Sequence, residues 1–150
     1  MLSVLKGISE TLHWSTAPMD VTLAVCCDAA NVSREGKLNL LGIFNSIHAA
    51  EFPCTHPHLA LVLRVEAGLG EEGTHPIEIK LADEDGHEVF KVNGQLALQG
   101  AQPGRPMTAQ TIIDINNFQL PRAGTYAFEI FIDNRHARSV SVHVLESERG

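Results

Sequence analysis

From Met19 onward, apolar and polar residues alternate with a period of two along most of the chain. The stretch "TYAFEIFID" shows this clearly, because Tyr126, Phe128 and Ile130 fall on one side of an extended backbone and the residues between them fall on the other. A β-strand points successive side chains to opposite faces, whereas a helix needs apolar residues three and four positions apart. The alternation therefore predicts a chain made of strands, each with one face to bury.

Turn signals divide this alternation into short segments. "DEDG" contains Asp85 and Gly86, a common hairpin pair, and "QGAQPGRP" and "PRAG" combine proline with glycine. No helical stretch separates the segments, so parallel strands connected through helices are not expected. The sequence predicts an all-β fold: an antiparallel β-sandwich of about eight strands, immunoglobulin-like in character, with a closed barrel of about eight strands as the alternative.

The aromatic residues near the C-terminus are interpreted as scaffold. Tyr126 follows the turn residue Gly124 by two positions, an arrangement similar to the tyrosine corner of immunoglobulin-like domains. In that corner the hydroxyl group bonds to the backbone a few residues upstream. We therefore expect Tyr126 and Phe128 to fill volume between two sheets rather than to stack on a ligand.

The first third of this alternating region is less regular. Apolar residues occupy both faces of the run from Lys37 to Ala49, which predicts one strand deep in a sheet. Gly42 in its middle indicates a bulge or a close backbone approach. Cys27 continues the apolar phase of Val21, which predicts a core residue. The two prolines of "EFPCTHPH" predict a loop.

Length and charge limit the classes of protein. A chain of 150 residues suits one domain, and residues 19–150 are predicted to form a single β-sandwich domain. Residues 1–18 are expected to be a flexible extension; a short amphipathic helix and a true start at Met19 stay open as alternatives. The net charge of −7 carries no basic face, so nucleic acid and membrane partners are not expected.

Two stretches, "AVCCDAANVSREGKLNLLGIFNSIHAAEFP" and "PRAGTYAFEIFIDN", resemble a bacterial family of β-sandwich proteins known only as a domain of unknown function, DUF6941. The resemblance runs from about Met19 to Leu145, and "GKLNLLGIF" carries most of its specificity. It implies a β-sandwich fold. It implies no activity, cofactor or partner.

Candidate binding residues are few. Asp28, Asn31 and Arg34 gather in one polar stretch, where they could fix a small polar ligand or shape the turn. His56 and His58 are candidate metal ligands, but zinc needs three or four ligands. No Gly-x-Ser-x-Gly elbow and no phosphate-binding loop is present, so we expect neither catalytic residues nor a cofactor.

These observations favour a non-catalytic interaction or accessory module that presents loops or a sheet edge to a protein partner or to itself. Two alternatives stay open. One is a small-molecule or metal-binding protein, for example a hydrolase, with a site in its loops, and the other is a structural component of a larger assembly. Because the three cysteines form no paired framework and no export signal is present, we expect the cytoplasm as its compartment.

Overall fold

The computed structural model describes residues 19–148, which form nine strands and no helix. The strands are β1 (Met19–Val32), β2 (Leu38–Phe44), β3 (Ser46–Ala49), β4 (Cys54–Ala67), β5 (Gly73–Ala82), β6 (Glu88–Leu98), β7 (Met107–Leu120), β8 (Gly124–Ile132) and β9 (Arg135–Glu146). The all-β prediction is therefore confirmed. Within the described range, no helix is long and apolar enough to cross a membrane. The predicted extension over residues 1–18 lies outside the described residues.

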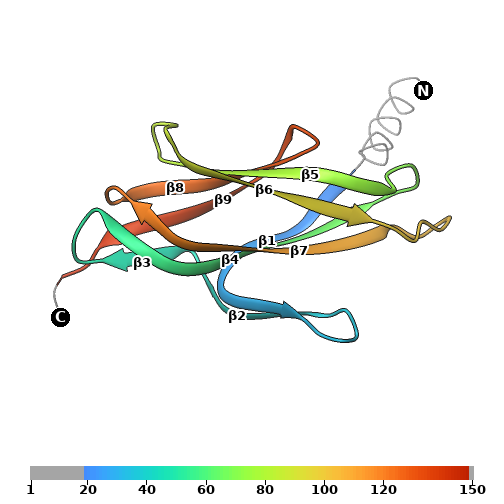
Figure 1. The fold of residues 1–150 in the computed structure, drawn as a ribbon, viewed down its shortest axis with the longest axis horizontal. Helices are drawn as coiled ribbons and strands as arrows, with labels where there is room; N and C mark the ends of the chain where they lie inside the picture. The colour runs from blue at the N-terminus through green and yellow to red at the C-terminus, as the bar shows by residue number, and fades with distance from the viewer. Residues whose placement is uncertain (1–18, 149–150) are drawn as a thin grey trace, which may run out of the picture.

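The strands form two sheets that lie in two layers (Figure 1). One sheet has four strands in the order β2-β1-β4-β7, and the other has five in the order β3-β9-β8-β5-β6. Two separate sheets replace the alternative of one closed barrel. All pairs are antiparallel except β3 with β9, which is parallel, so the prediction of a purely antiparallel fold of about eight strands needs this correction.

The core between the sheets is made by the alternating residues. Leu61 of β4, Ile79 of β5 and Ile130 of β8 are completely buried in one apolar cluster that includes residues of both sheets. Tyr126 and Phe128 are each 1% exposed in the same cluster, as expected for scaffold residues. Burying such side chains is the main favourable term in folding, so the period-two pattern both locates the strands and stabilises the layers.

The run from Lys37 to Ala49 is not one deep strand. It forms β2 at one edge of the four-stranded sheet and β3 at one edge of the five-stranded sheet. Its apolar residues occur on both faces for a different reason. Leu38 and Leu40 pack on a second, outer cluster, whereas Phe44 packs against the main core. Because the chain passes from one sheet to the other within this run, its apolar residues occur on both faces, as they would in a fully buried strand.

The outer cluster lies on the other face of the four-stranded sheet, and residues of both strands of the β1–β2 hairpin pack on it. Cys27 and Val62 are completely buried in it. The register of β1 shifts between Val21 and Leu23. Val21 therefore contacts the main core, whereas Cys27 faces the outer cluster. The prediction that these two side chains share one face is wrong. The Gln110 side chain of β7 donates a hydrogen bond of 2.9 Å to the hairpin's Gly36 carbonyl, which holds the hairpin across the sheet.

In the stretch predicted as a proline loop, residues 51–53 do connect β3 to β4, whereas residues 54–58 begin β4. There β4 pairs only with β7, because its pairing with β1 stops at Ala60. Pro57 has no partner in the β4–β7 register, and it faces Asn117, whose φ is +52°. A proline is tolerated in a strand at such an edge or irregularity, because no ladder hydrogen bond is lost. The proline signal therefore marked an irregular strand end.

Candidate functional site

A groove of about 900 Å³ lies between the two layers, where β6 of one sheet and β7 of the other form facing edges. Its walls come from the first half of β6, around Phe90, and from the second half of β7, around Phe118. Pro53 and Pro121 close one end. The groove has the mixture of apolar floor and polar rim that ligand sites share.

The floor of the groove is aromatic. The rings of Phe90 and Phe118 pack edge to face with centroids 5.4 Å apart, and Phe90 also lies 6.3 Å from the ring of Phe128. Phe118 and Phe128 are buried, whereas Phe90 is partly exposed to the groove. The aromatic side chains that join the two sheets therefore also offer an apolar surface to an incoming group.

Both walls are edge strands. Neither β6 nor β7 has a second hydrogen-bonded neighbour among the described strands. An edge strand presents backbone N–H and C=O groups that can pair with another extended chain. The groove thus combines an apolar floor with two free backbone edges, and the polar side chains of Asn116, Asn117 and Gln119 lie along the β7 wall.

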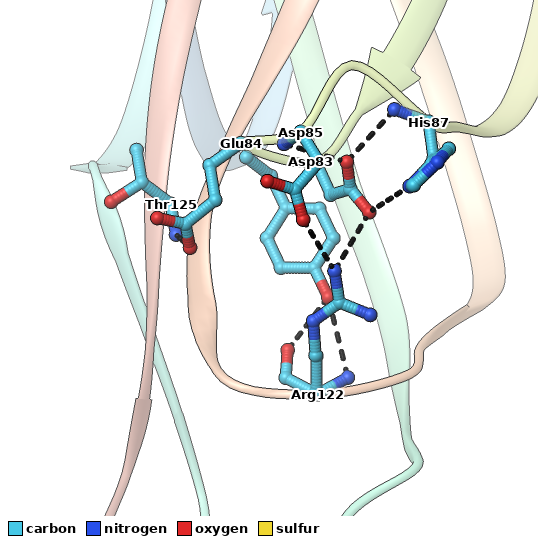
Figure 2. Close-up of polar contacts among 7 residues, drawn as sticks. Asp83, Glu84, Asp85, His87, Arg122 and Thr125 are labelled. Carbon is cyan, nitrogen blue, oxygen red and sulfur yellow. Dashed lines mark hydrogen bonds and ion pairs between the residues drawn. The ribbon is translucent and has the colours of Figure 1, made fainter.

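A polar cluster stands at one end of the groove, in the turn between β5 and β6 (Figure 2). Asp83 accepts hydrogen bonds from the backbone N–H groups of Asp85 and His87, at 3.0 and 2.8 Å. Its other oxygen lies 3.0 Å from the guanidinium of Arg122, which also approaches Asp85 at 3.4 Å. The amides of His87, first, and of Asp85 hold the pKa of Asp83 below its ordinary value.

Asp83, Asp85 and His87 offer ligand atoms within 4.8 Å of one another, a spacing that could suit a metal ion. The contacts argue for a structural role. The Asp83 carboxylate is already satisfied by two amides and by Arg122, whose guanidinium supplies the positive charge that a cation would bring. The cluster therefore fixes the turn against the segment before β8, and this segment forms the end of the groove.

A second triplet, Glu71, His75 and Asp133, lies at the opposite end of the layers. The Nδ1 atom of His75 is 2.8 Å from an Asp133 carboxylate oxygen, and its Nε2 atom is 2.7 Å from the Glu71 carbonyl. Both nitrogens therefore face oxygen acceptors. The Glu71 carbonyl, first, and the Asp133 carboxylate raise the pKa of His75, so it is suited to carry a proton rather than a metal.

A serine, a histidine and a glutamate meet on the outer face of β8 and β9. Glu129 accepts hydrogen bonds from Ser139 and from His136, the latter at 2.6 Å, and the His136 Nε2 atom is 3.2 Å from the Ser139 hydroxyl. In a catalytic triad the acid contacts the other imidazole nitrogen. Here serine and glutamate share one nitrogen and bond to each other, so this arrangement does not activate the serine.

The predicted ligand-binding residues do not converge. Asp28 and Asn31 lie in β1, and Arg34 is exposed in the turn that follows. The Asn31 side chain accepts a hydrogen bond of 2.9 Å from Asn39, and the Asp28 side chain lies against Gly42. No hydrogen bond or ion pair joins Arg34 to Asp28 or Asn31 in the part of the chain that the structure describes.

The two candidate metal ligands point to different sides of β4. His56 lies between the rings of Phe44 and Phe118, at 6.1 and 5.4 Å, and burial lowers its pKa. Its Nε2 atom is buried without a hydrogen-bond partner. The Nε2 atom of His58 instead lies 2.9 Å from an Asp114 carboxylate oxygen, within hydrogen-bond distance. Neither histidine belongs to a triplet of possible ligands among residues 19–148.

The groove itself was not predicted. Its β7 wall comes from "NNFQLPRAG", which reads as a connection, and its β6 wall reads as an ordinary return strand. The sequence feature that could have indicated the groove is the pair Phe90 and Phe118, two aromatic residues with polar neighbours in the chain. The sequence does not show that these strands end their sheets on the same side of the molecule.

Comparison with known proteins gives a family and no activity. A model described as "Family of unknown function (DUF6941)" matches residues 22–145, which is more than half of the chain. No curated protein matches. One solved structure that matches is the Pseudomonas fluorescens alkylpurine DNA glycosylase AlkC bound to DNA containing an abasic site analog, with 10% identity and a TM-score of 0.46. The match covers 89% of this chain and 32% of the glycosylase chain, so this chain spans about a third of its length.

This match corrects one expectation. The acidic net charge led us to exclude nucleic acid as a partner, yet one structure that matches is a DNA-bound enzyme. The exclusion is withdrawn. At this TM-score the likeness supplies no argument for a partner of its own.

Proposed function

The chain belongs to the DUF6941 family of unknown function, and we propose that it is a non-catalytic interaction module that binds an extended segment of a protein partner in the β6–β7 groove. The observation that carries the proposal is the presence of two unpaired edge strands on either side of one aromatic floor. Binding by addition of a strand uses backbone hydrogen bonds for affinity and side-chain pockets for specificity.

The charges of the groove indicate the chemistry of the segment. Arg122 is neutralised by Asp83 and Asp85, and Lys91 lies 3.5 Å from Glu78. Asp114 is paired with His58. Because Arg122 and Lys91 already have acidic partners, the segment needs no strong net negative charge. It needs extended backbone and an apolar side chain that covers Phe90.

We assign the two layers to the immunoglobulin-like sandwich class. The Tyr126 hydroxyl supports this assignment, because it donates a hydrogen bond of 2.6 Å to the Arg122 carbonyl four residues upstream, as in a tyrosine corner. We also propose the cytoplasm as the compartment. The three free cysteines support this, since a reducing environment keeps such thiols unpaired.

The groove is tested by selecting peptides from a random display library on the full chain. Asn116 is exposed and lines the groove, so Asn116→Trp fills it without touching the core. Gln95→Trp is the matched control, because Gln95 is exposed on β6 outside the groove.

We expect apolar, strand-forming peptides whose affinity falls at least about tenfold in Asn116→Trp and stays unchanged in Gln95→Trp. Peptides that bind both variants equally would contradict the proposal. A library that yields no binder to the wild-type chain would contradict it as well.

A further inference from the structure

The β1–β2 hairpin carries three of the five large apolar residues that are exposed in the described chain. These three residues are Val32, Leu41 and Ile43. Leu41 is 70% exposed and Ile43 is 63% exposed, both in β2. Single exposed apolar residues are ordinary, but a group of them on one element indicates a contact surface.

β2 is also an unprotected edge. It pairs with β1 on one side only, and its sequence, "LNLLGIF", contains neither a charged residue nor a proline. Edge strands normally avoid pairing with other chains by carrying such residues. Of the long edges in the described sheets, β2 alone is free of charge, since β6 has Glu88 and Lys91 and β7 has Asp114.

The absence of charge indicates which chain fits this edge. Two copies of a protein with a net charge of −7 repel each other, so a contact between them is favoured where the strands that meet carry no acidic residue. In an antiparallel pair related by a two-fold axis, a strand meets its own copy. For β2 this places apolar or amide side chains opposite one another, with no pair of like charges.

We propose that β2 pairs antiparallel with the β2 of a second copy, so that the two four-stranded sheets continue into one another. The pairing uses Leu38–Leu41, because Gly42, with a φ of +71°, lies outside the extended conformation of a regular strand. The second copy covers Leu41 and Ile43. Asn39 does not compete for the partner, since its side chain is bonded to Asn31 within the hairpin. This surface is separate from the β6–β7 groove.

The test is the mass of the full chain in solution, measured by sedimentation equilibrium over a range of concentrations. The variant is Leu41→Lys with Ile43→Lys, which puts like charges at the proposed contact. Leu69→Lys is the matched control, because Leu69 is 61% exposed in a loop away from β2.

We expect the wild-type chain and the control to form a dimer, and the double variant to weaken it at least about a hundredfold. Its far-ultraviolet circular dichroism should match the wild type, because both replaced side chains are exposed. Hydrogen exchange of wild-type β2 amides gives a second readout, and it should slow as the protein concentration rises.

A wild-type chain that stays monomeric at the highest concentration would overturn the proposal. A dimer that the double variant leaves intact would overturn it too, because the contact would then lie elsewhere. If the double variant does not fold, the concentration dependence of β2 exchange in the wild type decides the question alone. Failure of this dimer leaves the peptide-binding test of the groove unaffected.

Discussion

At the scale of the residue, Tyr126 connects the turn before β8 to the core. Its ring is 1% exposed, while its hydroxyl group donates to the Arg122 carbonyl at 2.6 Å and accepts from the Arg122 amide at 3.3 Å. One side chain thus fills apolar volume and satisfies two backbone groups that would otherwise lie near the protein interior without partners.

Replacing Tyr126 by phenylalanine should lower the free energy of unfolding by about 1 to 2 kcal/mol, because the ring stays and the two hydrogen bonds are lost. Urea denaturation measures this. Arg122→Ala is the control: it keeps the backbone partners of Tyr126 and removes an exposed side chain, so its effect should be smaller. Equal unfolding free energies of wild type and Tyr126→Phe would show that the hydrogen bonds of the Tyr126 hydroxyl do not stabilise the fold.

His75 should make stability depend on pH. Its pKa lies above the ordinary 6.5, first because of the Glu71 carbonyl and then because of Asp133, so the folded state binds the proton more tightly than the unfolded state. The stabilisation is complete below pH of about 6.5 and is lost as pH rises through the folded-state pKa.

The measurement compares wild type with His75→Gln by urea denaturation at several pH values. The difference in unfolding free energy should shrink as pH rises above the ordinary histidine range. Taking the difference removes the opposite contribution of His56, whose pKa is lowered by burial. A difference that does not vary with pH would rule out protonated His75 as a stabilising group.

At the scale of the element, the alternation located the strands well, and it failed where a strand changes phase. β1 shifts its register between Val21 and Leu23, and β4 and β7 change phase together at Pro57 and Asn117. Each irregularity moves the following side chains to the other face. This is why His56 faces the core whereas His58 faces outward, although a regular strand places residues two apart on one side.

Gly42 is a position at which the sequence did indicate an irregular backbone. Its φ is +71°, and a Cβ atom there would lie 2.9 Å from the Asp28 carboxyl carbon. The close approach is that of the Asp28 side chain, and the positive φ explains the glycine, whereas the β1–β2 register shows no bulge there. The sequence did not reveal that the strand around it lies at an edge.

Gly42→Ala should cost about 1 to 2 kcal/mol of unfolding free energy, since alanine is strained at positive φ and crowds Asp28. Gly68→Ala is the control, because Gly68 has open space around it and no positive φ. The control should change stability by less than about 0.5 kcal/mol. If both variants unfold at the same denaturant concentration, β2 does not depend on the glycine.

At the scale of the whole molecule, the sequence predicted two apolar-faced layers but not which strands end them. Strand order depends on which chain segments meet after folding, and a period-two pattern is the same for a central and an edge strand. The groove between β6 and β7 and the bare edge of β2 both follow from that order. Overall charge averages over surfaces as different as the apolar β2 and the charged rim around Asp83.

The most direct test of the groove is hydrogen exchange of the full chain with and without a selected peptide. The account predicts that amides of Glu88–Val92 or Asp114–Gln119 exchange more slowly in the complex, because an added strand pairs with one of these edges. Protection confined to other parts of the molecule, with both edges exchanging as in the free chain, would contradict it.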